Sequence, residues 1–256
     1  MGKRRWFLFL IFFLSACVST AEPTETPFSI QHIATTPEWE GLVSLWLTAY
    51  VQELAGANLK LELLSSEEIL SSMERGSVVL GFMDQGVPEG WFATPMKREA
   101  IVVIVNPEVR LESLQTDDLA DIFSGRVRSW EILAESSGSI QPIVPLPSSI
   151  SRERFTEVIM GNSAFDPSAI VGSTPDAVLE LVKSEPGAIG FIPAWRLEQG
   201  VNSVTIAGVE PRKETLESGA YPLWVDILAI SPEEPVGLLR DFLVWLQGTY
   251  LLSQEE

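Results

Sequence analysis

Apolar runs that alternate with helix signals set the strongest constraint on this chain. The runs "SVVLGF" (77–82) and "AIVVIV" (100–105) are almost entirely apolar, which is typical of strands covered on both faces of a sheet. A helical pattern fills 35–54, where Thr36 suits the N-cap and Pro37 the first helical position. The same alternation continues to the C-terminus and predicts an α/β protein with mostly parallel, buried sheets.

The first sixteen residues have the layout of a secretory signal. Positive charges in "MGKRR" precede the apolar run 6–14, which is much shorter than the roughly 20 residues of a membrane-spanning helix. The box "LSAC" before and at Cys17 resembles a bacterial lipoprotein signal. We therefore expect 1–16 to be a signal peptide and Cys17 to carry a lipid that anchors the protein to a membrane outside the cytoplasm. The alternative is an ordinary signal with an incidental cysteine.

The charge of the chain limits its partners. The formal net charge is −18, and removal of 1–16 takes away three basic residues and no acid, which makes it −21. Such a surface repels nucleic acid and does not steer anions from a distance, so an anion site has to act at short range. The segment 17–27 is rich in Thr, Pro and Glu and is expected to be a solvated tether. We expect a monomer that binds no nucleic acid.

Several common enzyme motifs are missing from the sequence. It contains no GxxxxGK[ST], no GxGxxG after a strand, no HExxH and no GxSxG. The single histidine, His32, lies within the first predicted strand, where a structural role is favoured. We therefore expect no enzyme activity, no metal site and no cofactor.

Hydroxyl side chains gather at the predicted starts of helices instead. Each of them is a suitable N-cap. Together, hydroxyls and free amides at helix starts bind oxyanions without a net positive charge. The candidates are Thr35, Thr36, Ser65, Ser66, Ser148, Ser149, Ser151 and Thr174.

Three segments resemble the phosphate-binding proteins of bacterial ABC importers. In "AIVVIVNPEVRLESLQTDDLADIFSGRVRSW" (100–130) an apolar strand, Asn-Pro, a Leu-rich helix and an Ile-Phe-Ser-Gly-basic-Trp run follow one another as in that family. The segments "EPGAIGFIPAW" and "YPLWVDILAI" are similar to its Pro-Gly-Ala-Ile-Gly-Tyr and Tyr-Pro-Leu strands. The resemblance runs from about Phe28 to the end.

This resemblance implies a fold and a division into lobes. It implies the periplasmic-binding-protein type II fold, with two α/β lobes, mixed sheets and a ligand cleft between the lobes. Lobe 1 is expected to combine 28–104 with 208–256, and lobe 2 to comprise 105–207. The stretch "LADIFSGRVRSWEIL" (119–133) is then lobe structure, with the ligand elsewhere.

The resemblance also implies ligand-binding residues. The two N-terminal hydroxyl loops of the family fall on Thr35 and Thr36 and on Ser65 or Ser66, and its acid falls on Asp84. Asp84 would favour hydrogen phosphate over sulfate, which has no proton to donate at neutral pH. The third loop falls on "PLPSSISRERF" (145–155) and contributes Ser148, Ser149, Ser151 and Arg152.

The third loop departs from the family pattern. Pro145 stands near the family's Arg, and Ile150 replaces a Gly, which adds bulk and restricts φ. Arg152 would restore the charge if it turned inward, and the alternative is a solvated helix residue. Four acids also crowd the first helical turns that should face an anion: Glu38, Glu40, Glu67 and Glu68.

Two functions remain open from the sequence. The first is a lipid-anchored extracytoplasmic solute-binding protein that captures a small oxyanion, phosphate above all, for the permease of an ABC importer. The second is a non-transport descendant of the same fold, an envelope sensor or scaffold that binds another solute or a protein partner. Asp84 and Arg152 in a polar cleft would favour the first function. A cleft that is apolar, blocked by Ile150 or filled by glutamates would favour the second.

Overall fold

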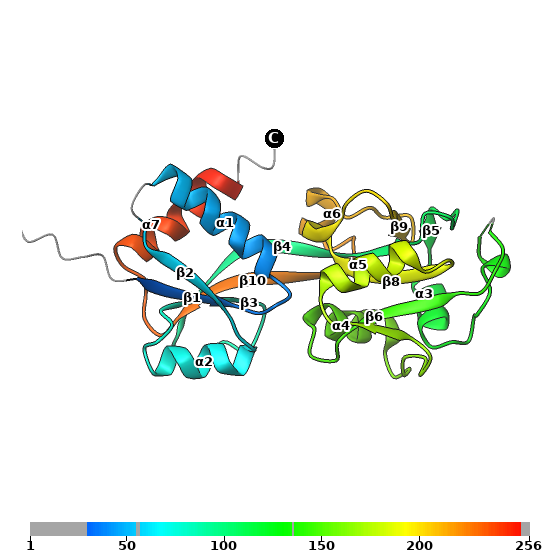
Figure 1. Cartoon of the computed structure of the whole chain (residues 1–256), viewed down its shortest axis with the longest axis horizontal. Helices are drawn as coiled ribbons and strands as arrows, with labels where there is room; N and C mark the ends of the chain where they lie inside the picture. The colour runs from blue at the N-terminus through cyan, green and yellow to red at the C-terminus, as the bar shows by residue number, and fades with distance from the viewer. Residues whose placement is uncertain (1–29, 55–56, 135, 252–256) are drawn as a thin grey trace, which may run out of the picture.

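The computed structural model describes residues 30–54, 57–134 and 136–251. The expected signal peptide 1–16, Cys17 and the tether 17–27 lie outside the described residues. Figure 1 shows two bodies, each built from strands and helices, that are joined by long strands. Within the described ranges, no helix is both long enough and apolar enough to cross a membrane.

The first lobe is a sheet with helices on both faces. Its strand order is β2-β1-β3-β10-β4, with β1 parallel to β2 and β3, and β10 antiparallel to β3 and β4. In Figure 1, α1 and α7 lie on one side of this sheet and α2 on the other. The elements are β1 (Gln31–Thr35), α1 (Glu40–Glu53), β2 (Leu59–Leu63), α2 (Ser66–Glu74), β3 (Leu80–Met83), β4 (Phe92–Val105), β10 (Trp224–Ser231), α7 (Leu238–Trp245) and the π-helical η4 (Leu246–Tyr250).

The second lobe continues from β4 into a sheet of order β4-β8-β6-β7. Strand β8 is antiparallel to β4, while β6 is parallel to β8 and β7. The elements are β5 (Ser113–Leu114), α3 (Thr116–Phe123), η1 (Trp130–Ile132), β6 (Gln141–Pro145), α4 (Ile150–Phe155), the π-helical η2 (Thr156–Met160), β7 (Ile170–Gly172), α5 (Pro175–Ser184), β8 (Ala188–Pro193), η3 (Ala194–Arg196), β9 (Asn202–Ile206) and α6 (Lys213–Glu217).

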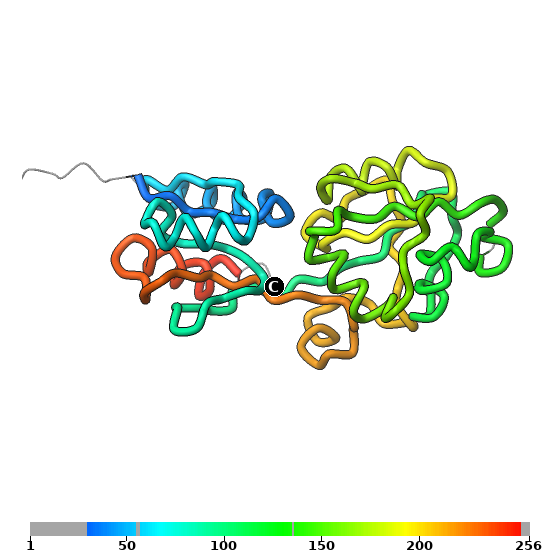
Figure 2. The backbone as a smooth tube through the Cα atoms, turned by 90° about the horizontal axis from the view of Figure 1, so that it is seen from below, coloured from blue at the N-terminus to red at the C-terminus, as the bar shows by residue number. Residues whose placement is uncertain are grey.

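Two strands connect the lobes. Residues 92–100 of β4 pair with β10, and residues 101–105 pair with β8, so one continuous strand belongs to both sheets. Figure 2 shows β4 and β10 crossing together between the bodies. The expected return to lobe 1 at residue 208 is too early, because α6 lies beside the second lobe and the chain crosses back only in β10. The sheets are mixed, since the joining strands are antiparallel.

The stretch 119–133 is part of the second lobe's core. Helix α3 buries Leu119 and Phe123, and the Phe123 ring meets Phe155 and Phe191 edge to face. Trp130 is fully buried, and its indole N–H donates to the carbonyl oxygen of Gly187 at 2.9 Å. Burial of rings of this size supplies a large share of the apolar area that stabilises a lobe.

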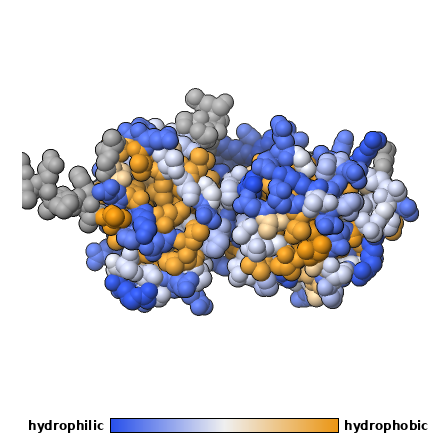
Figure 3. Space-filling view, viewed as in Figure 1, coloured by the Kyte–Doolittle hydropathy of each residue, from blue (hydrophilic) through white to orange (hydrophobic). Residues whose placement is uncertain are grey.

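Apolar surface remains on both lobes. Figure 3 shows separate apolar areas on the two bodies, with the seam where they meet between the areas. Exposed aliphatic side chains include Leu45 and Leu63 on the first lobe and Leu146 and Val171 on the second. Single exposed apolar residues are normal on a soluble domain, so these do not by themselves mark a binding surface.

Gly187 offers a test of the second lobe's packing. Its φ is +72°, and a Cβ there would lie 2.3 Å from the carbonyl oxygen of Ser139. Gly208 has nearly the same φ, +76°, with nothing within 4 Å of a Cβ. We expect Gly208→Ala to lower the free energy of unfolding by about 1 kcal/mol through the left-handed backbone alone. Gly187→Ala should lower the free energy of unfolding by about 2 kcal/mol more than Gly208→Ala does, because the backbone at Ser139 has to move. Urea unfolding of both variants measures the difference, and equal losses would contradict this account of the close approach.

Candidate functional site

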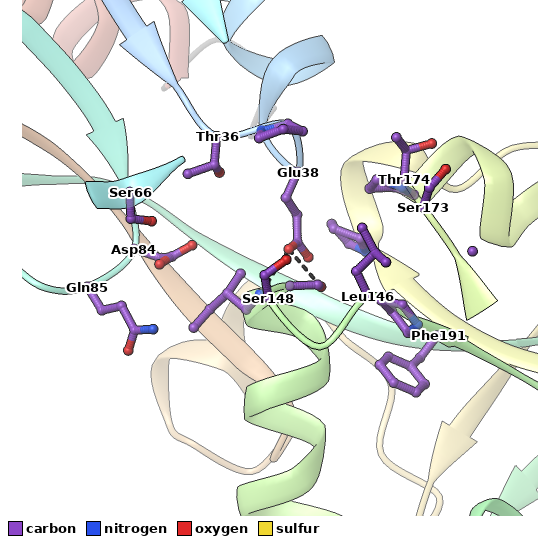
Figure 4. Close-up of a pocket in the computed structure, with 17 residues that line it drawn as sticks. Thr36, Glu38, Ser66, Asp84, Gln85, Leu146, Ser148, Ser173, Thr174 and Phe191 are labelled. Atoms are coloured by element: carbon purple, nitrogen blue, oxygen red, sulfur yellow. Dashed lines mark hydrogen bonds between the residues drawn. The ribbon is translucent and has the colours of Figure 1, made fainter. Parts of the chain in front are cut away.

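A cavity of about 120 Å³ lies between the lobes. That size suits a small solute, because pockets for drug-sized ligands have roughly 300–1,000 Å³. Figure 4 shows side chains from both lobes turned toward it. No Lys, Arg or His stands among the described residues that line it. The polar lining residues are Thr36, Glu38, Ser66, Asp84, Gln85, Ser148, Ser149, Ser173 and Thr174.

The strand ends explain why these residues meet. On the first lobe, the segments after the parallel strands β1, β2 and β3 supply Thr36, Ser66 and Asp84. On the second lobe, Ser149 follows β6 and Thr174 follows β7, which are also parallel. The carboxyl ends of parallel strands share one edge of a sheet, and ligands of α/β proteins bind outside that edge. The two edges face each other here.

The first-lobe hydroxyls divide into structural groups and free ones. Thr35 is fully buried and donates to the carbonyl oxygen of Phe82 at 3.0 Å, which ties β1 to β3. Ser65 caps α2, because its hydroxyl accepts from the amide of Glu68 and donates to its carboxylate. Thr36 and Ser66 line the cavity, and among the described residues the buried Thr36 hydroxyl has no hydrogen-bond partner.

Asp84 lies at the wall of the cavity. Its Oδ2 accepts from the indole N–H of Trp39 at 3.0 Å. Burial raises the pKa of the Asp84 carboxyl and the charge of Glu153 adds to the rise, whereas the Trp39 hydrogen bond opposes it. Burial therefore favours the protonated form of this carboxyl at the cavity wall.

Glu38 was named from the sequence only as one of four acids near helix starts, and not as a residue that joins the lobes. Its carboxylate reaches from the loop before α1 to the start of α4 on the other lobe (Figure 4). It accepts from the Ser149 hydroxyl at 2.8 Å, the Ile150 amide at 3.0 Å, and the Ser151 amide at 3.2 Å. The Ser151 hydroxyl donates as well. Glu38 is 8% exposed. The donors at the start of α4, which the resemblance assigns to an anion, therefore bind this side chain instead.

The electrostatics of Glu38 follow from this burial. Burial raises the pKa of the Glu38 carboxyl, and the hydroxyl bonds from Ser151 and Ser149 oppose the rise. The nearby Asp84 charge raises the pKa further. Two acids thus share a cleft whose described lining carries no basic side chain.

Arg152 does not bring positive charge into the cavity. Its guanidinium donates to the carbonyl oxygen of Pro145 at 2.8 Å and lies 4.6 Å from the centre of the Phe165 ring. The condition under which Arg152 would restore charge, a side chain turned into the cavity, is therefore not met in this structure. Ile150 lines the cavity without filling it, and its backbone N–H donates to the Glu38 carboxyl group.

The lobes are also bridged beside the cavity. Gln85 donates to the Glu153 carboxylate at 2.8 Å, and the Trp195 amide donates to Glu99 at 2.6 Å. The Trp195 ring lies so close to Gly41 of α1 that a Cβ on that glycine would be 2.6 Å from it. Contacts between the lobes are thus present at Gln85 and Glu153 and at Gly41 and Trp195.

Lining residues that were not named from the sequence include Gln85, Ser173 and Phe191. Glu38 was named only as one of four acids near helix starts. Gln85 and Ser173 each stand next to a residue already singled out, Asp84 and Thr174, so widening the loops would have found them. Within the described residues, no cluster of His, Cys, Asp or Glu is arranged to hold a metal ion.

The raised pKa of Glu38 predicts a pH dependence of stability. Between the ordinary value of 4.5 and the raised value, the folded protein binds a proton that the unfolded chain has lost. The contribution of this group is present below pH 4.5 and is lost as pH rises through the folded-state pKa. The Glu38→Gln variant lacks this titrating group. Its free energy of unfolding should therefore decline less steeply than that of the wild type over about pH 4 to 8. Urea unfolding across this range measures the slope.

Two comparisons complete this test. Asp84 also has a raised pKa and contributes with the same sign in both proteins, so a smaller decline should remain in Glu38→Gln. Glu40→Gln, at an exposed acid in the same region of the chain, should keep the wild-type slope. Identical slopes for wild type and Glu38→Gln would contradict the prediction.

Comparison with known proteins places the architecture. A family model described as PBP superfamily domain matches residues 20–249. Phosphate-binding protein PstS of Bacillus subtilis (strain 168) is 25% identical over 207 residues, which cover 78% of this chain and 69% of that protein.

Solved structures agree with this match. A candidate phosphate ABC transporter substrate-binding protein with bound phosphate from Clostridium perfringens has a TM-score of 0.77 at 17% identity, covering 88% of this chain and 97% of that one. An ABC-type phosphate transport receptor from Vibrio cholerae has a TM-score of 0.68 at 16% identity, covering 87% and 96%. At these identities the likeness shows the fold. With two mixed α/β lobes around a cleft and a family match over most of its length, the chain belongs to the PBP superfamily and has the periplasmic-binding-protein fold.

Proposed function

We propose that this protein is an extracytoplasmic solute-binding protein that captures a small oxyanion, phosphate above all, for an ABC importer. The observation that carries the proposal is the convergence of hydroxyls from both lobes on one small cavity at the carboxyl ends of the strands. Relatives named as phosphate-binding proteins support the choice of ligand. The role is binding and delivery, without catalysis.

The proposed contacts use neutral donors. Thr36 and Ser66 would donate from the first lobe, and Ser149, Ser173 and Thr174 from the second. Thr36 is the strongest candidate, because its buried hydroxyl lacks a partner in the described structure and a buried unpaired hydroxyl is costly. A ligand that accepts this hydrogen bond gains affinity from satisfying the group.

Asp84 would select among oxyanions. A carboxylate accepts hydrogen bonds and has none to donate when ionised, so it favours an anion that still carries a proton. Hydrogen phosphate satisfies this condition and sulfate at neutral pH does not. Asp84 alone would thus distinguish phosphate from sulfate, two anions of similar shape.

The membrane attachment belongs to the same proposal. Residues 1–16 would be removed as a signal peptide and Cys17 would receive the lipid, with 17–27 as the tether. The protein would act as a monomer and meet its partner, the membrane permease, at the surface to which it is anchored.

A second function is favoured by specific features of the cleft. The donors of α4 are turned to Glu38, and the Arg152 guanidinium contacts Pro145 and Phe165 instead of the cavity. Both features suit a sensor or scaffold that descends from a transport protein and has lost free access to its anion site. Binding measurements separate the two candidates.

Calorimetry with phosphate, sulfate, molybdate and a sugar panel tests the proposed function. We expect heat with phosphate, and a loss of affinity of about tenfold in Thr36→Val, which removes one hydroxyl donor to a charged ligand. Ser65→Ala is the matched control, because its hydroxyl caps α2 outside the cavity. The absence of binding heat with every oxyanion would favour the second function.

Asp84→Asn tests the source of selectivity. The amide can donate where the carboxylate only accepts, so sulfate should bind the variant more tightly than it binds the wild type, and phosphate less tightly. The dissociation constant for sulfate divided by that for phosphate, measured by the same titrations, should fall about tenfold in the variant. An unchanged ratio would remove Asp84 from the account of specificity.

A further inference from the structure

We propose that the Glu38 carboxylate is an internal ligand of the cleft, which occupies the oxyanion subsite at the start of α4 and which an incoming oxyanion has to displace. The inference rests on the proposed function and deepens it. It makes Glu38 a specificity-determining residue that acts by competition.

The donor set around Glu38 is that of an oxyanion site. Two backbone amides, of Ile150 and Ser151, and two hydroxyls, of Ser149 and Ser151, all donate to one carboxylate. The helix that follows extends through α4 and η2 to Met160. A carboxylate and a phosphate present the same kind of acceptor oxygens to such donors. The same atoms cannot serve both groups at once.

The burial of Glu38 shows that this contact is built into the fold. A charged side chain is rarely so buried unless it is paired, and Glu38 is 8% exposed with its oxygens satisfied by uncharged donors. Its neighbours in the chain are also fixed, since Trp39 is fully buried and donates to Asp84. The carboxylate is thus held at the α4 donors by the packing around it.

The contact also joins the lobes. Glu38 belongs to the loop between β1 and α1, whereas its donors follow β6 on the second lobe. Release of the carboxylate therefore goes together with movement of the loop or opening of the cleft. A solute that takes its place would restore a bridge between the same two lobes.

Displacement is favoured over binding beside Glu38. The described lining of the cavity has no basic side chain, and Asp84 already stands at its wall. An added anion next to two carboxylates would meet repulsion from both in a poorly solvated space. The observed affinity is then the intrinsic affinity multiplied by the fraction of molecules in which Glu38 has left the donors.

This competition defines the class of ligand. A replacement for Glu38 has to offer at least two acceptor oxygens to the four donors, which a phosphate, a phosphonate or a carboxylate does. A neutral sugar lacks the charge that strengthens such hydrogen bonds. The expected ligands are therefore small oxyanions that outcompete an attached carboxylate.

Titration with inorganic phosphate tests the competition. We expect Glu38→Ala to bind phosphate at least about tenfold more tightly than the wild type, since it no longer has an internal competitor. Glu38→Gln, which keeps the volume of the side chain, should shift affinity in the same direction. Glu40→Ala, at an exposed acid two residues away, should bind as the wild type does. If the wild type binds phosphate, unchanged or weaker phosphate binding in both Glu38 variants would overturn the inference.

A second measurement separates this inference from the proposed function. Small-angle scattering without any ligand should show a larger radius of gyration for Glu38→Ala than for the wild type and Glu40→Ala, because the buried Glu38 contact between the lobes is lost. If Glu38→Ala opens the lobes but no variant binds an oxyanion, the internal contact stands and the proposed function fails. If Glu38→Ala neither opens the lobes nor changes phosphate affinity, the inference fails.

Discussion

Both halves of the cleft depend on one strand that belongs to two sheets. Strand β4 pairs with β10 over residues 92–100 and with β8 over residues 101–105. Because this strand is continuous, the loops after β1, β2 and β3 face the loops after β6 and β7 across a short gap. Glu38 and Ser149 are far apart in the sequence, yet they come within hydrogen-bond distance there. The chemistry of the site follows from this juxtaposition more than from any local motif.

Much of the fold could be predicted because it depends on local patterns. The run 100–105 is buried throughout, as its apolar composition predicts, and Ser65 caps α2 as a hydroxyl at a helix start should. The expected N-cap at Thr36 is wrong, because a turn follows it and α1 begins only at Glu40. The lobe boundary near residue 208 could not be placed from the same patterns. The helix signals of α6 say where a helix forms, but they carry no information about the lobe on which it packs.

The charge of the site was beyond local reasoning. Arg152 has a long side chain whose direction is decided by the Pro145 carbonyl and the Phe165 ring, both supplied by tertiary structure. From the sequence, Glu38 is one of four acids near predicted helix starts, and nothing in its neighbourhood distinguishes it from Glu40. What distinguishes it is a set of donors on the opposite lobe. A side chain that bridges two lobes can be identified only when the positions of both are known.

Charge balance then restricts what the cleft can exchange. Burial raises the pKa of both Glu38 and Asp84, so further negative charge in this space is opposed before any ligand arrives. When Glu38 leaves, one acidic group is removed from the space that the oxyanion enters. An anion that keeps a proton can also donate to Asp84, which a fully ionised one cannot. The net charge of −18 matters less, because exposed charges are screened beyond about 8 Å at physiological ionic strength. Recognition is therefore decided by the few donors and acids inside the cleft. The Glu38 carboxylate, which already binds these donors, indicates the kind of group that they recognise.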